Sequence, residues 1–380
     1  MMNFLKEAEN LYDELTALRH SIHRRPEIGG REFLTASLIE QYLNGLGIKT
    51  ERLSATAILG TLEFDRPGKT IAFRADMDAL PVTEITGCDF ASETPGIMHA
   101  CGHDVHTSAL LGTAKLLSLH KSELSGCVKF FFEPDEEGDG GAGCMIDAGC
   151  MEGVSAVYGA HMDPALELGS VGVRYGKFYA ASNMFNVTIH GKSAHGAMPE
   201  KGIDALLCAA KIICALKELP KSFPEGEAVL SVGTIASGSA RNIIADTAVF
   251  TGIIRTLGND VRDGMLYEFK KIINDVCASF GAAAETEMIS THNGIVNTQK
   301  ETDLAKEAFE GIDGIKVVEI EKPLMISEDF GYFIDEAAGS FYHIGAGSSH
   351  CLHSASFLPD DRAVIITAAA HTAVAFKELS

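Results

Sequence analysis

The chain has 380 residues, of which 46% are hydrophobic and 22% are charged. This length exceeds what a single hydrophobic core usually fills, so two domains are expected. With 31 Lys and Arg against 52 Asp and Glu, the formal net charge is −21, which argues against nucleic acid and anionic membrane as partners and favours a small-molecule substrate.

Both ends of the chain have the pattern of helices that pack against a sheet. The first thirty residues alternate charged and apolar positions at helical spacing and contain no continuous apolar core, which argues against a signal peptide. The apolar run at 363–376 is too short to span a bilayer. The nine cysteines are odd in number and scattered, which is typical of free thiols in a reducing compartment. A cytoplasmic location is therefore expected.

Strands and helices alternate from about residue 3 to 165 and again after about residue 291. The pattern predicts strands at 70–75, 126–132, 154–160 and 341–345, and helices at 105–119 and 360–378. Such alternation predicts a doubly wound α/β sheet.

The middle of the chain has a different order. It predicts strands at 184–191, 228–236, 247–256 and 282–290, and helices at 202–219 and 261–280. This βαββαβ order is the ferredoxin-like pattern and completes a small α+β domain. We therefore expect a discontinuous catalytic domain, residues 1–177 and 291–380, interrupted by an inserted domain, residues 178–290.

The stretch HACGHDVHTSALLG at 99–112 places a thiol and several imidazoles directly ahead of a predicted helix. The chain has no Cys-x-x-Cys pair, so a metal bound by Cys101 and His103 needs further ligands from distant parts of the sequence.

Suitable groups follow two of the predicted strands. One strand leads to the adjacent carboxylates Glu136 and Glu137, and another ends directly at His161. In open α/β sheets, ligands bind beyond the carboxyl ends of the strands, so these residues could converge in one crevice. The sequence HCLH at 350–353 offers a further candidate.

Each of these residues also has a structural interpretation. A lone Cys is usually a small buried hydrophobe, a lone His is usually hydrogen-bonded or at the surface, and paired Glu residues usually form a solvated face. Their grouping at strand ends favours a metal site over these separate explanations.

The chain resembles the M20 metallopeptidase and aminoacylase family, in particular the amidohydrolase branch with hippurate hydrolases, indole-acetyl-amino-acid hydrolases and N-acetyldiaminopimelate deacetylases. The resemblance covers nearly the whole chain. It rests on HRRPEIGGRE at 23–32, RADMDALP at 74–81, HACGHDVHT at 99–107, EPDEEGDGGA at 133–142, GAHMDP at 159–164, GKSAHGAMP at 191–199, SEDFGYF at 327–333 and the late His353.

The resemblance implies a pair of divalent metal ions (Zn, Mn, Co or Ni) with Glu136 as the general acid/base. The ligands that it implies are Cys101, His103, Glu137, His161 and His353. Hydrolysis of an unactivated amide needs a strong nucleophile and charge neutralisation at the carbonyl oxygen, and two close metals supply both. Adjacent carboxylates can divide the work, one binding metal and one carrying protons.

Residues close to these motifs are expected to support the site. Asp78 is predicted to orient a ligand rather than to bind metal. Adjacency favours supporting or surface positions for His99, His106 and His350. The acidic motif reads EPDEE, and the extra charges of Glu133 and Asp135 are expected to raise the pKa of Glu136.

The resemblance assigns substrate recognition to the inserted domain. It implies that His195 reaches an active site and helps to stabilise the oxyanion, and that Asn242 and Arg255 bind substrate. An arginine can bind a substrate carboxylate bidentately, although pairing of Arg255 with an acidic side chain is an equally good interpretation. In the family, the position of His195 serves the partner subunit, so a homodimer formed through the inserted domain is expected.

The expected function is a metal-dependent amidohydrolase that removes the acyl group from N-acyl amino acids. A dipeptidase or carboxypeptidase on the same scaffold is the alternative within enzymes, since only pocket contacts would differ. A non-catalytic metal-binding regulatory protein is the alternative from another class. The intact Glu136 beside Glu137 argues against it, because a sensor has no use for a proton carrier.

Overall fold

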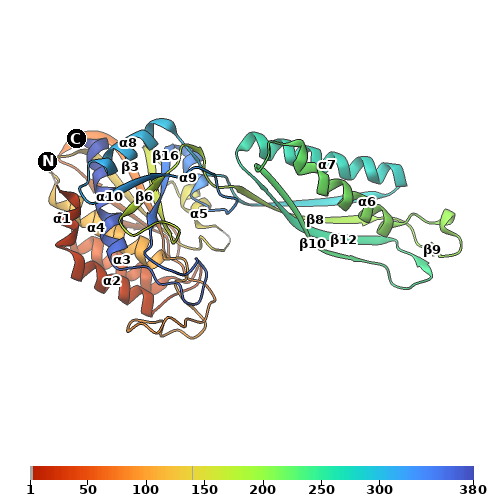
Figure 1. Ribbon diagram of the computed structural model, residues 1–380, viewed down its shortest axis with the longest axis horizontal. Coiled ribbons are helices and arrows are strands. Elements are labelled where there is room, and N and C mark those ends of the chain that lie inside the picture. The colour runs from red at the N-terminus through yellow and green to blue at the C-terminus, as the bar shows by residue number, and fades with distance from the viewer. Residues whose placement is uncertain (1–2, 139) are drawn as a thin grey trace. The chain divides into compact units, whose positions relative to one another are not determined.

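The computed structural model describes residues 3–138 and 140–380, which divide into two compact units (Figure 1). Unit 1 comprises residues up to 176 together with 296–322 and 329–380, and unit 2 comprises residues 177–295 and 323–328. The boundaries expected from the sequence place residues 323–328 in the catalytic domain, whereas in the structure this short segment belongs to unit 2.

A mixed eight-stranded sheet forms the centre of unit 1. Its strand order is β1 (Lys49–Arg52), β2 (Ile58–Glu63), β4 (Ser125–Glu133), β3 (Arg66–Asp76), β5 (Val154–Asp163), β16 (Ala338–Gly345), β6 (Ser170–Val173) and β15 (Lys316–Glu319). The four central strands β4, β3, β5 and β16 run parallel. Their carboxyl ends therefore meet at one edge of the sheet, which is where ligands bind in α/β proteins.

Helices cover both faces of this sheet, which confirms the doubly wound architecture. One face packs into the main core with α1 (Phe4–Glu9), α2 (Tyr12–Arg24), α3 (Phe33–Gly45), α4 (His103–Leu119), α8 (Gln299–Glu310) and α10 (Arg362–Leu379). Phe130 and Phe132 of β4 point into that core, whereas Phe131 points to the opposite face. There its ring lies 5.3 Å from that of Phe333 in α9 (Gly331–Glu336), which packs beside α5 (Gly141–Asp147).

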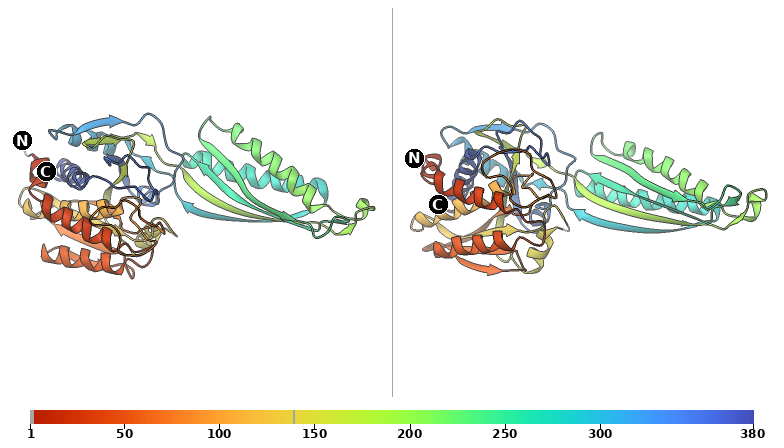
Figure 2. Two further views of the ribbon diagram at one scale, coloured as in Figure 1. Left: turned by 60° about the horizontal axis from the view of Figure 1, so that its bottom comes forward. Right: turned by 90° about the horizontal axis from the view of Figure 1, so that it is seen from below.

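Unit 2 is built around a four-stranded antiparallel sheet with the order β10 (Ala228–Ser237), β12 (Thr247–Thr256), β8 (Ala181–His190) and β13 (Ala283–His292). Helices α6 (Ala205–Glu218) and α7 (Asn259–Phe280) lie along one face of this sheet (Figure 2). Phe185, Phe250 and Phe269 fill the core between the sheet and the helices. The order of elements confirms the ferredoxin-like prediction.

Smaller elements complete the two units. In unit 2, β9 (Ala194–His195) pairs with β11 (Ile243–Ile244), and 3₁₀ turns occupy Pro199–Lys201 and Leu219–Ser222. The strands β7 (Gly176–Lys177) and β14 (Val296–Asn297) pair where the chain leaves and re-enters unit 1. Within the described ranges, no helix has the length and apolar character that a membrane span requires.

Candidate metal centre and active site

The turn before α4 sets two of the predicted ligands side by side. Gly102 is the N-cap of α4 and has a φ of 94°, in the left-handed region that glycine adopts without steric cost. A Cβ at this position would lie 2.8 Å from the Cγ atom of Met162. Glycine is therefore required between Cys101 and His103, and the turn presents both side chains at the carboxyl edge of the sheet.

The five predicted ligands come together in unit 1. The Sγ atom of Cys101 lies 3.4 Å from Nε2 of His161 and 3.3 Å from Nε2 of His353. Nε2 of His353 lies 3.0 Å from Oε1 of Glu137. Several groups in the described residues have their ligand atoms within 4.8 Å of one another, and two of them contain only predicted ligands: Cys101, His103 and His161, and Cys101, Glu137 and His353. Because the two groups share Cys101, the cluster has the layout of a site for two adjacent ions.

One ring nitrogen in this cluster is left open. Nδ1 of His103 lies 3.0 Å from Oδ1 of Asp78, and Nε2 of the same ring is buried without a hydrogen-bond partner among residues 3–138 and 140–380. Metal-binding histidines typically have one nitrogen bonded to a carboxylate and the other free for the metal. A thiolate, imidazoles and a carboxylate also match the donors that Zn and similar divalent ions prefer. The residues present therefore fit a divalent metal.

Buried carboxylates make this region electrostatically suited to cations. Burial lowers the pKa of His103, but the charge of Asp76 and the hydrogen bond to Asp78 outweigh it and raise the pKa to about 10. Burial, followed by the charges of Glu137 and Glu136, raises the pKa of the Cys101 thiol well above its ordinary value. A bound cation would lower the pKa of this thiol instead, because a thiol that coordinates a metal is deprotonated.

Asp78 holds two of the candidate ligands at once. Besides its contact with His103, its Oδ2 atom accepts a hydrogen bond of 3.1 Å from the backbone N–H of Glu137. The carboxylate of Glu136, which is 6% exposed, approaches the same cluster, with Oε2 3.9 Å from Nε2 of His103. The adjacent glutamates thus contact different partners, as a division between metal binding and proton transfer requires.

His106 supports the site from α4. Its Nδ1 atom lies 2.6 Å from Oδ1 of Asp76, and its Nε2 atom accepts a hydrogen bond of 2.9 Å from the N–H of Met162. Both ring nitrogens are therefore occupied, and Asp76 is held at the end of β3. This arrangement leaves His106 no lone pair for a metal.

Sequence reasoning missed Arg74, which is buried in β3 among the acidic residues behind the cluster. Its guanidinium lies 2.7 Å from Asp76 and 2.9 Å from Asp329, and it also pairs with Glu133. The sequence does contain a signal for this cluster. An arginine lies within the apolar run TIAFRA, and a charge buried in a strand requires oppositely charged partners. Since Glu133 is compensated in this way, it does not act as a free negative charge beside Glu136.

In unit 2, the structure places His195 beside Asn242. His195 pairs with Ile243 across the β9–β11 ladder, and the N–H of Gly196 donates to the carbonyl of Asn242 at 2.7 Å. His195 is exposed, and its Nδ1 atom accepts from the N–H of Ala197 at 3.1 Å.

Arg255 lies at the opposite end of the unit 2 sheet. Strand β12 runs from Thr247, opposite His190, to Thr256, opposite Ala181, and His195 follows the His190 end. At about 3.4 Å per residue, the stretch from Thr247 to Arg255 spans about 27 Å. The guanidinium of Arg255 donates to the carbonyl of Met325 at 2.9 Å. Within one unit 2, His195 and Arg255 are therefore too far apart to contact the same small molecule.

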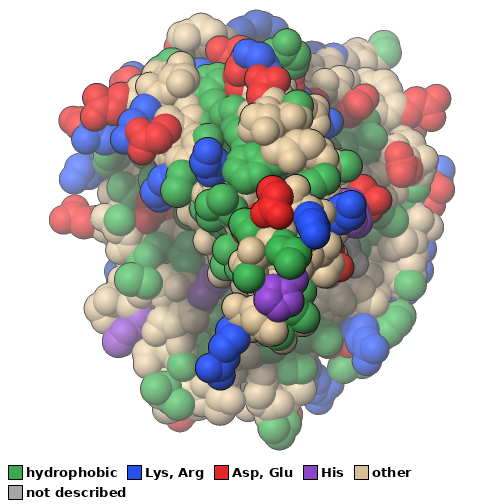
Figure 3. Space-filling model, turned by 90° about the vertical axis from the view of Figure 1, so that its right-hand side faces the viewer, with side chains coloured by type: hydrophobic (Ala, Val, Ile, Leu, Met, Phe, Trp, Pro, Cys, Tyr) green, Lys and Arg blue, Asp and Glu red, His purple; other side chains and the backbone are tan. Residues whose placement is uncertain are grey.

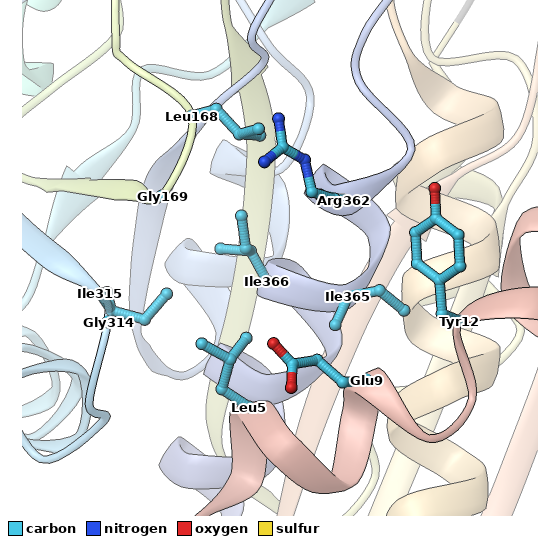
Figure 4. Close-up of a pocket in the computed structure, with 10 residues that line it drawn as sticks. All are labelled: Leu5, Glu9, Tyr12, Leu168, Gly169, Gly314, Ile315, Arg362, Ile365 and Ile366. Atoms are coloured by element: carbon cyan, nitrogen blue, oxygen red, sulfur yellow. The ribbon is translucent and has the colours of Figure 1, made fainter.

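A pocket of about 480 Å³ lies elsewhere in unit 1 (Figure 4). It is lined by Leu5, Glu9, Tyr12, Leu168, Gly169, Gly314, Ile315, Arg362, Ile365 and Ile366. Arg362 is already paired with Asp360 at 2.8 Å. None of the candidate metal ligands lines this pocket, so the chemistry belongs to the carboxyl edge of the sheet and not to this cavity.

Comparison with known proteins identifies the family. A model described as peptidase family M20/M25/M40 matches residues 72–375. Thermostable carboxypeptidase 2 of Saccharolobus solfataricus is 36% identical over 99% of this chain and 98% of its own. N-acetyl-L-cysteine deacetylase of Bacillus subtilis is 35% identical over 95% of this chain and 88% of its own.

A solved structure has the same architecture. The YXEP protein of Bacillus subtilis, described as a dinuclear metal-binding peptidase from the M20 family, superposes with a TM-score of 0.87. It is 30% identical, over 97% of this chain and 98% of that one. These relatives are hydrolases, which agrees with a cluster that fits metals beside the carboxylate of Glu136. The chain belongs to peptidase family M20/M25/M40 and is a metal-dependent amide hydrolase.

Proposed function

We propose that this enzyme removes the acyl group from N-acyl amino acids, with two divalent ions held by the cluster around Cys101. The observation that carries the proposal is the pair of adjacent carboxylates, Glu137 against the ligand His353 and Glu136 facing His103. Similarity to a deacetylase of an N-acetylated amino acid and to a dinuclear metal-binding peptidase supports it.

The proposed chemistry uses Glu136 as the proton carrier. When bound, the two ions supply charge neutralisation at the amide carbonyl and acidify a water molecule. The carboxylate of Glu136 takes the proton from the attacking water and delivers it to the departing amine nitrogen. Asp78 holds the ring of His103 and the backbone of Glu137 during this exchange, so neither has to reorganise.

The choice of ion follows from the donor set. The thiol of Cys101 favours ions that accept sulfur, such as Zn, while imidazole and carboxylate donors are also compatible with Mn, Co or Ni. We propose Zn, Mn, Co or Ni as the cofactor, with the loading in the cell decided by availability.

We further propose that the enzyme acts as a homodimer joined through unit 2, with His195 serving the partner's active site. His195 would donate a hydrogen bond to the oxyanion, and Asn242 lies beside it. Arg255 would bind the substrate carboxylate. The separation of about 27 Å along β12 supports this arrangement, because His195 and Arg255 of one chain cannot meet at one substrate.

Unit 2 also offers apolar surface for such a contact. Exposed hydrophobic side chains on its strands include Met184, Val229, Ile235, Val249 and Ile289. The end of unit 2 that carries β9 has hydrophobic side chains at its surface among charged ones (Figure 3). Exposed apolar groups of this kind favour self-association through a shared face.

We propose a cytoplasmic location. The cysteines within the described residues are free thiols, and Cys208 and Cys277 remain unbonded although their Sγ atoms lie 3.9 Å apart. Scattered cysteines without a disulfide framework are typical of proteins from a reducing compartment.

A substrate panel tests the proposed function. Purified enzyme loaded with each ion in turn is assayed with N-acetylmethionine, N-acetylcysteine and hippurate, and with dipeptides and carboxypeptidase substrates. The expected result is a higher kcat/KM on the N-acyl amino acids, lost on chelation and restored by the metal. A preference for peptides would favour the carboxypeptidase or dipeptidase alternative, to which the similarity to thermostable carboxypeptidase 2 points.

A further inference from the structure

A buried carboxylate near the N-terminus contacts the backbone of the acidic turn. Glu32 precedes α3 and is fully buried. Its Oε1 atom accepts hydrogen bonds from the N–H of Gly30 and from the N–H of Asp135, both at 2.9 Å. Asp135 directly precedes Glu136, so a residue 103 positions earlier in the chain contacts the backbone next to the proton carrier.

The contact is made at a position where the backbone adopts an unfavourable conformation. Asp135 has a φ of 58°, in the left-handed region that costs a non-glycine residue about 1 kcal/mol or more. Its carbonyl accepts from the N–H of Gly140 at 3.1 Å, which closes the turn on the other side. A Cβ at Gly29 would lie 1.8 Å from Oδ1 of Asp135, so the segment before Glu32 is shaped around this turn.

The two N–H groups that flank Glu136 are both held by buried carboxylates. Glu32 accepts from Asp135 on one side, and Asp78 accepts from Glu137 on the other. Hydrogen bonds to a charged acceptor are about twice as strong as neutral ones. The pair fixes the direction in which the side chain of Glu136 leaves the backbone, and its Oε2 atom remains 3.9 Å from Nε2 of His103.

We propose that Glu32 is a positioning residue for Glu136, holding the left-handed turn at Asp135 so that the carboxylate stays aligned for proton transfer. The inference rests on the proposed role of Glu136 as the proton carrier. A displacement of about 1 Å in a reacting group can reduce the rate by about a hundredfold. Loss of Glu32 should therefore lower kcat while KM and metal content change little.

The first test compares two substitutions in the full-length, metal-loaded enzyme. Glu32→Ala removes the acceptor, whereas Glu32→Gln keeps an oxygen that can accept from Asp135. We expect Glu32→Ala to reduce kcat at least tenfold, with KM within about twofold and metal per chain unchanged by elemental analysis. Glu32→Gln should retain most of the wild-type kcat.

The second test asks whether the turn itself is what Glu32 holds. Glycine adopts a φ near 58° without the steric cost, so Asp135→Gly should make the turn less dependent on its acceptor. The double variant Glu32→Ala with Asp135→Gly is expected to recover several-fold in kcat over Glu32→Ala alone. A residue that only stabilises the fold would lower the melting temperature without this recovery, so thermal unfolding is followed in parallel.

The outcomes separate the inference from the proposed function. Wild-type kcat in folded Glu32→Ala would overturn the inference, as would a loss of metal in proportion to the loss of kcat. If Glu32→Ala does not fold, Glu32→Asp, whose shorter side chain withdraws the acceptor, is measured instead and unchanged kcat has the same meaning. If Glu136→Gln retains full kcat, the proposed role of Glu136 as the proton carrier fails, and positioning of Glu136 by Glu32 fails with it. The proposed function itself fails only if the substrate panel shows no deacylation of N-acyl amino acids.

Discussion

The candidate site residues of unit 1 and those of unit 2 differ in burial and in the number of groups that hold them. In unit 1, Cys101, His103 and His161 are buried, and their positions are fixed by strand ends, a glycine turn and carboxylate partners. In unit 2, His195 lies exposed on a two-residue strand, and the Nδ1 atom of its ring accepts a hydrogen bond from the backbone N–H of Ala197. The residues of unit 1 are brought together by one chain, whereas His195, among the residues that the structure describes, is not enclosed by other side chains of its own chain.

This difference shows which functions a single chain can organise. Metal binding needs several donors within a few ångströms, and folding of unit 1 brings them together from distant parts of the sequence. The proposed stabilisation of the oxyanion by His195 would need a substrate beside it, and β12 separates that end of unit 2 from Arg255. Substitutions in unit 1 should therefore change metal content or chemistry within each subunit, while those at His195 should act between subunits.

The largest expected effect comes from the adjacent glutamates of unit 1. Glu136→Gln should keep its metals and lose about a hundredfold or more in kcat, since a general acid/base is removed. Glu137→Gln should weaken metal binding instead, because its carboxylate is a proposed ligand and contacts the proposed ligand His353. Steady-state kinetics with elemental analysis measures both. Reversed phenotypes would show that the two carboxylates have been assigned the wrong way round.

A cysteine from each unit provides the next comparison. Cys101→Ser should lower the metal content and the activity recovered after chelation and reloading, because Cys101 belongs to both donor groups. The matched control is Cys214→Ser, which removes an exposed thiol of α6 in unit 2. It should leave both quantities unchanged. Equal metal content in Cys101→Ser and wild type would contradict the ligand assignment.

A smaller effect should appear in the pH dependence of stability. Burial lowers the pKa of His23 in α2, but Asp104 and Glu84 outweigh it and raise the pKa to about 9. A pKa raised on folding stabilises the protein fully below the unfolded value of 6.5, and this contribution is lost as the pH rises through about 9. The free energy of unfolding should therefore fall across this range, by at most about 3 kcal/mol.

Denaturant titrations at pH 6 and pH 9.5 measure this loss. His23→Gln should flatten the pH dependence because the group that titrates has been removed. An unchanged slope in His23→Gln would show that other groups cause the pH dependence.

Much of the fold could be predicted from the sequence because its hydrophobic residues recur at the regular spacing of helices and strands. The apolar run that became β4 and the alternating strands of unit 2 predicted both sheets, and the HACGHD segment predicted a thiol beside an imidazole. Those signals are local, so they could be interpreted without knowledge of the distant partners of each residue.

The remaining features depend on contacts between distant residues. Arg74 joins carboxylates from β3, β4 and the segment at Asp329, and no spacing in the sequence signals that they meet. Glu32 reaches the turn at Asp135 in the same way. The positive φ of Asp135 could not be predicted from the sequence either. Glycine is the residue that usually indicates such a conformation, and position 135 is an aspartate. Such features follow from the tertiary fold and not from local pattern.

The most direct test of the account mixes two nearly inactive variants, His195→Ala and Glu136→Gln, and allows their subunits to exchange. If His195 serves the partner's site, half of the dimers contain both variants, and each of these has one intact site. The expected activity is about a quarter of the wild-type value by symmetry counting. If exchange is verified by native mass spectrometry and the activity stays at the background of the separate variants, action of His195 across the dimer is contradicted.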